Sequence, residues 1–478
     1  MAQAGIVALM AWFFLSRLVA AAIAVITLFI LTRLLAPDDF ARYNIIVLSG
    51  TISFYFCASW LPVSVTRFNS TPEYQGQTVA MAQGIGVAST LLLLTLTLLA
   101  ALVVPSEWRG TFLLSASVAF ASAVHEFGLA CLRVQQRGPA FAVAAVLRPL
   151  LALLFTVAFI LHGGDFRSAI AAFSLGALLP GVLAVALAAR SSGFRRPSGA
   201  ALRTFLRFGL PVAAVGSGAL LFPLSSQLLL ATAAGLTEVG FFAAASTLAD
   251  RTIVMLMGTL RQATAADVFH AEEQGNDSDL NRFLESHYAL LLLVSVPLLG
   301  VCLFAPDTVT RILFADGFDA GVARYLPILA LAAFISGVAG SFLGFVFELR
   351  RQTLRELALT CCLLTVHVSG VAALLRIIGN EGAAYGTLVT AIAMMSIYSW
   401  YARRTFIRGY LVRHSLKVAA ALGAGAPFLA AADRLGSPAL AMLCLAVGLA
   451  VMLVVLKLLR YSSLEAILNA VLGRLRRT

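Results

Sequence analysis

Fourteen apolar runs, each about 20 residues long, limit most strongly what this chain can fold into. A helix needs about 20 mostly apolar residues to cross the hydrocarbon core of a membrane, and within lipid it must satisfy its own backbone hydrogen bonds. The runs therefore predict an all-α polytopic membrane protein with about 14 transmembrane helices. Their approximate limits are 11–33, 43–65, 79–104, 111–132, 139–161, 168–189, 208–233, 239–261, 284–305, 325–347, 356–376, 382–402, 415–432 and 437–459.

The composition agrees with a membrane protein and disfavours soluble classes. Of the 478 residues, 60% are apolar and 12% are charged, whereas an average soluble domain has about 45–50% and about 25%. Such a chain cannot cover its apolar residues with a charged surface, so a soluble enzyme, a disordered chain and a disulfide scaffold are all disfavoured. The six cysteines lie inside apolar runs and lack metal-ligand spacing, so we expect neither a metal nor a cofactor.

The basic residues predict the orientation. With the N-terminus placed in the cytoplasm, 24 lysines and arginines fall at cytoplasmic ends of spans and 8 at outer ends, while Arg148 and Arg251 lie deep within spans. Cytoplasmic loops carry an excess of Lys and Arg in membrane proteins generally, so both termini are predicted to be cytoplasmic. The same rule accounts for the net charge of +12 without a nucleic-acid partner.

The more hydrophilic segments divide the chain into predicted parts. A basic loop before residue 208 separates an N-terminal lobe of six spans (1–190) from a C-terminal lobe of six spans (208–402). Two further spans occupy 415–459. Residues 461–478 combine apolar residues at helical spacing with three arginines, which predicts an amphipathic cytoplasmic helix lying on the membrane surface.

A short pattern of acid, any residue, small residue, any residue, aromatic residue occurs three times. It precedes or opens predicted spans 2, 8 and 12, and its first two copies lie 199 residues apart. This spacing favours two pseudo-symmetric lobes, as in transporters built from repeats, although turns before helices also favour acids and small residues on their own. The three copies are Asp39–Tyr43, Glu238–Phe242 and Glu381–Tyr385.

No catalytic motif is present, so the function is expected to reside in the membrane. We find no phosphate-binding loop, zinc-protease motif or nucleophile elbow in the chain, and we predict no catalytic residue. Ionisable groups inside a membrane are costly and usually mark functional pathways. His125 and His367 are expected to be hydrogen-bonded packing residues. The candidate substrate-binding residues are Arg17, Glu126, Arg148, Gln227, Asp250 and Arg251.

The arginines among these candidates favour an anionic substrate. Arg251 lies about 12 residues into its span, or about 18 Å along a helix, which is too deep for easy contact with the membrane surface. Its neighbour Asp250 does not face it on a regular helix, so Glu126 or water is the expected resting partner. Arginine binds phosphate oxygens with two parallel hydrogen bonds, and three arginines from three spans would suit a phosphate-bearing ligand.

The chain resembles the polysaccharide (O-antigen type) flippases of the multidrug/oligosaccharidyl-lipid/polysaccharide exporter superfamily. That superfamily also contains lipid II flippases and multidrug and toxin extrusion exporters. The resemblance covers nearly the whole chain through diffuse motifs. These are Ser16-Arg17, the segment 31–43 (LTRLLAPDDFARY), Phe205–Pro211 (FLRFGLP), Glu238–Phe242 with the following AAASTLA, Ile312–Phe318 (ILFADGF) and Gly382–Tyr385 (GAAY).

The resemblance implies two six-helix lobes around a central cavity that opens alternately to the two sides of a bacterial inner membrane. The implied substrate is a polyprenyl-pyrophosphate-linked oligosaccharide, moved to the periplasmic leaflet for lipopolysaccharide, capsule or exopolysaccharide synthesis. A polymerase and glycosyltransferases are implied as partners, besides membrane lipids. The similar lipid II flippases carry cavity arginines in spans 1 and 8, which correspond here to Arg17 and Arg251.

Two alternative functions remain. Where the family often has Asp-Arg in span 7, this chain has Ser225-Ser226-Gln227, so coupling to an ion is in doubt. A cation-coupled multidrug exporter would be expected to carry an acid in span 1 or 7, but Leu9–Leu31 and Phe208–Ala233 contain none. A membrane-embedded glycan-processing enzyme would be expected to have a sizeable domain outside the membrane.

Overall fold

Every regular element in the described part of the chain is helical, in agreement with the predicted all-α fold. The computed structural model describes residues 2–69, 78–192, 198–275, 277–350, 352–403, 408–435 and 437–461. The predicted amphipathic helix in 461–478 falls almost entirely outside these residues. Each apolar run of the sequence corresponds to one helix, or to consecutive helical segments, because an apolar chain without water to bond its backbone must bond it internally.

Contacts between Cα atoms divide the chain into two compact units. The first comprises Met1–Ala231, Gly235–Gly240 and Thr353–Thr365, and the second comprises the remaining residues. The division of the chain into lobes at 1–190, 208–402 and 415–459 stays a prediction.

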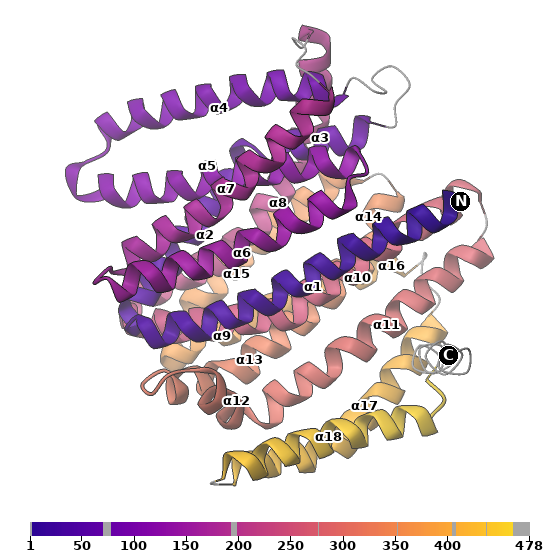
Figure 1. Ribbon diagram of the computed structural model, residues 1–478. Helices are drawn as coiled ribbons and strands as arrows, with labels where there is room; N and C mark the ends of the chain where they lie inside the picture. Colours follow the sequence, from indigo (N-terminus) through magenta and orange to yellow (C-terminus); the bar gives the residue numbers. More distant parts are fainter. Residues whose placement is uncertain are drawn as a thin grey trace. The chain divides into compact units, whose positions relative to one another are not determined.

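Among the described residues, the first unit contains α1 to α8, apart from the last three residues of α8, and short parts of α9 and α15 (Figure 1). Within it α7 packs against both α5 and α6, α1 packs against α6, and α2 against α5. Its helices are α1 (Ala2–Leu34), α2 (Pro37–Cys57), α3 (Trp60–Phe68), α4 (Thr78–Val103), α5 (Ser106–Val134), α6 (Gly138–Leu161), α7 (Phe166–Ser192) and α8 (Gly199–Ala234).

The second unit contains the remaining helices. Here α13 packs against α16, and α11 packs against α10, α13 and α17, while α17 pairs with α18. Its elements are α9 (Leu236–Ala249), η1 (Asp250–Val254), α10 (Met255–Glu273), α11 (Asp277–Phe304), α12 (Pro306–Leu313), α13 (Asp319–Val338), η2 (Ala339–Leu343), α14 (Phe345–Leu349), α15 (Thr353–Ile378), η3 (Gly379–Glu381), α16 (Gly382–Ala402), α17 (Arg408–Asp433) and α18 (Pro438–Leu458).

The helices confirm a multi-pass membrane fold. Among the described residues, ten helices are long and apolar enough to cross a membrane, or eleven if the bent pair α2 and α3 forms one span. One of the ten is the stretch Leu354–Ala402, which contains both α15 and α16 and which the sequence analysis counts as two spans. The total of fourteen spans therefore stays a prediction.

Two predicted loops are much shorter than expected. The loop at 190–207 is mostly helical, because α7 continues to Ser192 and α8 already begins at Gly199, where the Ser198 side chain accepts a hydrogen bond from the Ala201 amide (3.1 Å). The sequence also predicts a turn of helix and a loop at about 262–283, and there α10 continues to Glu273 and α11 already begins at Asp277. Low hydropathy marked these segments as leaving the membrane, but polar helical turns continue beyond it.

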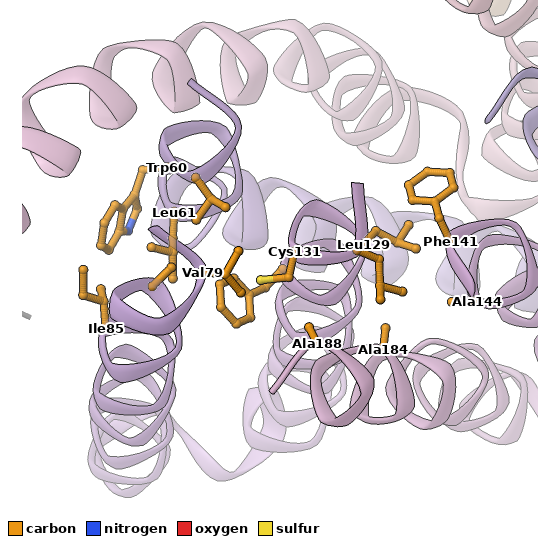
Figure 2. Close-up of a cluster of buried hydrophobic side chains, with 14 of the residues drawn as sticks. Trp60, Leu61, Val79, Ile85, Leu129, Cys131, Phe141, Ala144, Ala184 and Ala188 are labelled. Carbon is orange, nitrogen blue, oxygen red and sulfur yellow. The ribbon is translucent and has the colours of Figure 1, made fainter. Parts of the chain in front are cut away.

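The first unit holds a tightly packed apolar core around α3, the start of α4 and α5 (Figure 2). Trp60 and Leu61 of α3 meet the start of α4 at Val79 and Ile85, and Cys131 lies among them. On the other side of α5, small residues let the helices approach closely, because an added carbon at Gly128 would lie 2.7 Å from the Cβ of Ala184. The helices of this unit are therefore packed on both sides of α5, which fixes the polar residues that α5 carries.

The small residue of the recurring pattern has a packing role in the first unit. Gly240 lies so close to α2 that an added carbon would come within 2.3 Å of the Pro37 carbonyl oxygen. Beside it, Thr237 donates a hydrogen bond to Asp38 (2.5 Å). Ala41, at the same position of the first copy, is fully buried. A larger side chain at this position would push the helix ends apart, so close packing explains the small residue.

Candidate functional site

Arg148 lies at the centre of a polar cluster inside the first unit. Its Nη1 donates to Glu126 Oε1 (3.1 Å) and lies 3.4 Å from His125 Nδ1, while Nη2 donates to the Ser122 hydroxyl (3.3 Å). Its guanidinium also lies 5.5 Å from the ring centroid of Phe173 on α7. The charge of Arg148 is thus neutralised and hydrogen-bonded by residues of its own unit.

The local sequence explains why these side chains meet. Ser122, His125 and Glu126 are spaced three and four residues apart, so α5 presents them on one face. On α7, Gly181 lets the helix approach so closely that an added carbon would lie 2.8 Å from the His125 backbone. His125 is buried, and its Nε2 lies 3.3 Å from the Ala144 carbonyl oxygen of α6. The cluster therefore ties α5 to α6, which is a structural contribution.

A hollow of about 790 Å³ lies beside this cluster, between α5 and α7. Ser117 and Ser174 line it and share a hydrogen bond of 3.0 Å, while Glu107 and Arg167 lie at its exposed end. None of the six predicted site residues lines this hollow.

Gln227 and Asn44 form an amide pair between α8 and α2. Gln227 is buried and its Nε2 donates to Asn44 Oδ1 (3.0 Å). Its Oε1 is buried without a hydrogen-bond partner among the described residues. Asn44 is not among the predicted substrate-binding residues, although it is a lone amide in an apolar span, which is the feature that marked Gln227 as a candidate.

Arg251 lies in a stretch of π-helix in the second unit. In η1 the Met255 amide donates to the Asp250 carbonyl oxygen, five residues back, instead of four. The extra residue per turn widens the helix, and such bulges occur frequently at functional sites. Sequence periodicity alone could not reveal it, because the surrounding residues are ordinary helix formers.

The side chains of Asp250 and Arg251 are both exposed. Asp250 forms a hydrogen bond with Ser246, one turn earlier on α9. Throughout the part of the chain that the structure describes, the Arg251 guanidinium has no hydrogen bond or ion pair. The expected resting partner, Glu126, pairs with Arg148 instead.

A second arginine of the same helical span, Arg261, has both an ion pair and a hydrogen bond within the second unit. Arg261 on α10 pairs with Glu348 of α14 (2.8 Å), hydrogen-bonds the Gly340 carbonyl of η2 and lies 4.7 Å from the Phe345 ring centroid. His287 lies 3.1 Å from the neighbouring Ser341 carbonyl. The π-helix η2 thus has side-chain partners for two of its carbonyls, which the sequence analysis did not predict.

The structure brings only some of the predicted residues together. It joins Glu126 to Arg148, and Asp250 and Arg251 share η1, whereas Gln227 pairs with the unpredicted Asn44. The backbone of Arg17 is helical in α1, but its side chain lies outside the described residues. His367 is buried and hydrogen-bonds Thr390 (2.8 Å), as expected for a packing histidine. Among the described residues, no group of His, Cys, Asp or Glu has the arrangement of a metal site.

Comparison with known proteins connects this fold to membrane transporters. Residues 6–264 match the family described as polysaccharide biosynthesis protein, whereas no curated protein sequence matches the chain. Among solved structures, the lipid II flippase MurJ in an inward closed conformation superposes with a TM-score of 0.66 at 12% identity, covering 98% of this chain and 99% of the flippase.

Multidrug transporters share the same fold. An inward-facing multidrug resistance MATE family transporter of the MOP superfamily gives a TM-score of 0.64 at 16% identity, covering 82% of this chain and 98% of the transporter. A eukaryotic MATE transporter gives 0.58 at 14% identity, with 86% and 96% covered. Because all of these identities lie below 25%, the likenesses show that the chain shares the fold of these proteins.

Proposed function

The chain belongs to the polysaccharide biosynthesis protein family, and we propose that it is a flippase for polyprenyl-pyrophosphate-linked oligosaccharides. It moves these lipids from the cytoplasmic to the periplasmic leaflet of a bacterial inner membrane by alternating access, with both termini in the cytoplasm. The oligosaccharides then serve the synthesis of a surface polysaccharide (lipopolysaccharide O-antigen, capsule or exopolysaccharide). Family membership and the multi-pass transporter fold support this proposal.

The observation that carries the substrate assignment is the unpaired guanidinium of Arg251. A charged side chain deep in a membrane costs about 2.5–3.5 kcal/mol on insertion scales, yet this one has no hydrogen bond or ion pair among the described residues and interacts only electrostatically with the neighbouring Asp250. A pyrophosphate would supply two or more charge-assisted hydrogen bonds, each contributing about 1.5–3 kcal/mol. Substrate binding would thus add hydrogen bonds that the described residues do not give this guanidinium, beside the electrostatic attraction of Asp250.

The other candidate residues have different roles in this proposal. Arg17 is a further candidate for contacting an anionic group of the substrate, in line with the cavity arginines of similar flippases. Gln227 presents its buried, unpartnered Oε1 to hydroxyl or amide donors of the sugar. Asp250 remains bonded to Ser246 and reduces the local positive charge, which eases release of the anion.

Arg148 and Glu126 act as a support in the proposed mechanism. Their ion pair is 3.1 Å long and the two side chains are only 23% and 30% exposed. The positive charge of this arginine is already balanced by a carboxylate, so a second anion would gain less from it than from an arginine without an ion pair. The pair therefore stabilises the first unit while Arg251 contacts substrate.

The multidrug-exporter alternative receives less support from the residues. The likeness to multidrug transporters lies at or below 16% identity and shows the fold alone. Neither Leu9–Leu31 nor Phe208–Ala233 contains an acid for a cation, and Gln227 of α8 is neutral. A glycan-processing enzyme receives less support because the solved structures that share this fold are a flippase and transporters. A polymerase and glycosyltransferases are proposed as the neighbouring partners that use and supply the lipid.

The test is a flipping assay with purified protein in liposomes. A fluorescently labelled polyprenyl-pyrophosphate oligosaccharide is incorporated, and a membrane-impermeant quencher reports how much moves between leaflets. We expect the wild-type protein to move the labelled lipid at least about 10-fold faster than empty liposomes, a difference of about 1.4 kcal/mol in barrier. Equal rates with and without protein, combined with export of a cationic dye, would replace this proposal by the drug-exporter alternative.

A further inference from the structure

Among the described residues, the first half of α8 has one face that docks on α3 and one face that carries exposed side chains, which we call the uncovered face. The docked face packs on α3, where Phe68 stacks on Phe205 at 5.2 Å and the Ser64 hydroxyl donates to the Phe205 carbonyl (2.8 Å). An added carbon at Gly209 would lie 2.4 Å from the Trp60 carbonyl. Because Phe205 and Gly209 are one helical turn apart, this docking fixes the rotation of α8 about its axis.

The uncovered face carries two arginines and a row of leucines. This face carries an open surface depression of about 360 Å³. It is lined by Gly199, Leu202, Arg203, Leu206, Arg207 and Leu210. Arg203, Arg207 and Leu210 are exposed, and Leu202 and Leu206 are half-buried. In the described residues, neither guanidinium has a hydrogen-bond or ion-pair partner. We call this surface the Arg203–Arg207 face.

The spacing of the two arginines favours a ligand with two adjacent anionic groups. Side chains four residues apart on a helix lie about 5–6 Å from each other at Cβ, so both guanidinia can reach one ligand. Each guanidinium binds one phosphate with two parallel hydrogen bonds. A single phosphate would satisfy one arginine, whereas a pyrophosphate satisfies both.

The leucines favour a ligand that also has an apolar chain. Leu202, Leu206 and Leu210 are four residues apart and form a row beside the arginines. We propose that the Arg203–Arg207 face is a loading site that captures the pyrophosphate of an isoprenoid lipid in the cytoplasmic leaflet, with the isoprenoid chain lying along the leucines. This inference rests on the proposed function and adds a first binding step, remote in sequence from Arg251.

Binding, rather than transport, tests the loading site. The full-length protein is placed in lipid nanodiscs and carries Arg251→Ala, so that binding to Arg251 does not contribute. Geranylgeranyl pyrophosphate is the probe. The variant Arg203→Gln/Arg207→Gln is expected to raise the Kd at least about 10-fold, which equals 1.4 kcal/mol. The Kd of Arg203→Lys/Arg207→Lys should lie between those of the parent protein and the glutamine variant, since lysine keeps the charge but cannot form two parallel hydrogen bonds to one phosphate.

Two controls separate this ligand from other anions. Arg190→Gln removes an exposed arginine from the end of α7 and should leave the Kd unchanged within about 2-fold. Geranylgeranyl monophosphate and phosphatidylglycerol should compete at least about 10-fold less well, and inorganic pyrophosphate should bind more weakly because it lacks the chain.

Each outcome decides the inference separately from the flippase proposal. An unchanged Kd in Arg203→Gln/Arg207→Gln, an equal loss in Arg190→Gln, or equal competition by phosphatidylglycerol overturns the loading site, even if the protein flips lipid-linked sugar. If the protein flips no lipid-linked sugar but the binding of geranylgeranyl pyrophosphate depends on both arginines, the site stands and the transport proposal fails.

Discussion

Arg148 in the first unit and Arg251 in the second lie in the interior of apolar spans, but their surroundings are opposite. Arg148 has a carboxylate, a histidine and a hydroxyl within 3.4 Å. Arg251 is exposed on a π-helix and has no such partner among the described residues. Depth in a membrane alone therefore does not identify a substrate ligand. What distinguishes a functional charge from a structural one is whether the fold itself satisfies it.

The largest expected stability effect comes from breaking the Arg148 pair. Glu126→Ala leaves a half-buried guanidinium without its carboxylate, so we expect the free energy of unfolding to fall by about 2 kcal/mol. Thermal and denaturant unfolding in detergent micelles would measure this change.

The matched control replaces both partners with methionine. The free energy of unfolding of Glu126→Met/Arg148→Met should lie within about 1 kcal/mol of the wild-type value, since apolar replacement of an ion pair often leaves stability unchanged. A Glu126→Ala protein as stable as the wild type would mean that Arg148 is not held by this cluster, and the contrast with Arg251 would disappear.

A smaller effect is expected from the helix packing that surrounds the cluster. Gly176→Ala adds a carbon that would meet the Ala152 backbone nitrogen at 2.4 Å, which forces α6 and α7 apart and costs about 1–2 kcal/mol. Gly110→Ala is the control, because its added carbon meets nothing within 4 Å. We expect only Gly176→Ala to lower the unfolding temperature, and equal unfolding temperatures for the two variants would show that close packing at Gly176 does not support the cluster.

The amide pair between α2 and α8 should have a moderate effect. Gln227→Leu removes one hydrogen bond to Asn44 but also removes a buried acceptor that has no partner among the described residues. The two changes have opposite effects on stability, so we expect the free energy of unfolding to change by less than about 1 kcal/mol. Binding of the sugar-bearing lipid should weaken more than binding of geranylgeranyl pyrophosphate. Equal weakening would show that Gln227 does not contact the sugar.

The smallest expected effect concerns Asp250. Asp250→Asn keeps a hydrogen-bonding group near Ser246 but removes a negative charge beside Arg251. At about 7 Å in a water-like medium, one unit charge contributes about 0.6 kcal/mol, so pyrophosphate-lipid binding should tighten about 3-fold. Isothermal binding measurements at low salt would detect this shift. Weaker binding would indicate that Asp250 positions Arg251 directly.

Several structural features could be predicted from the sequence because one property determines each. Hydropathy determined the helices, since a run of apolar residues has few other solutions in lipid. It misplaced the loop at 190–207 because polar helical turns such as Gly199–Phe208 continue outside the membrane with the same backbone bonding. Depth in a span selected Arg148 and Arg251 as candidate substrate-binding residues, and that role stays a prediction.

The remaining features depend on three-dimensional contacts. Glu126 and Arg148 lie 22 residues apart, and no local spacing shows that α5 and α6 bring them together. The π-helices η1 and η2 have no sequence signature that differs from α-helix, and the pairing of Arg261 with Glu348 and Gly340 depends on how α10 packs near η2. These are the features that separate a satisfied arginine from an unsatisfied one.

The most direct test compares Arg251→Ala with Arg148→Ala in the liposome flipping assay, normalised to the amount of folded protein. We predict that Arg251→Ala lowers the rate at least about 100-fold, about 2.7 kcal/mol, while its unfolding temperature stays that of the wild type. Arg251→Lys should restore the rate only in part. Arg148→Ala should lower stability and leave the rate per folded molecule within about 3-fold. Wild-type flipping by Arg251→Ala, or loss of activity only in Arg148→Ala, would contradict the account.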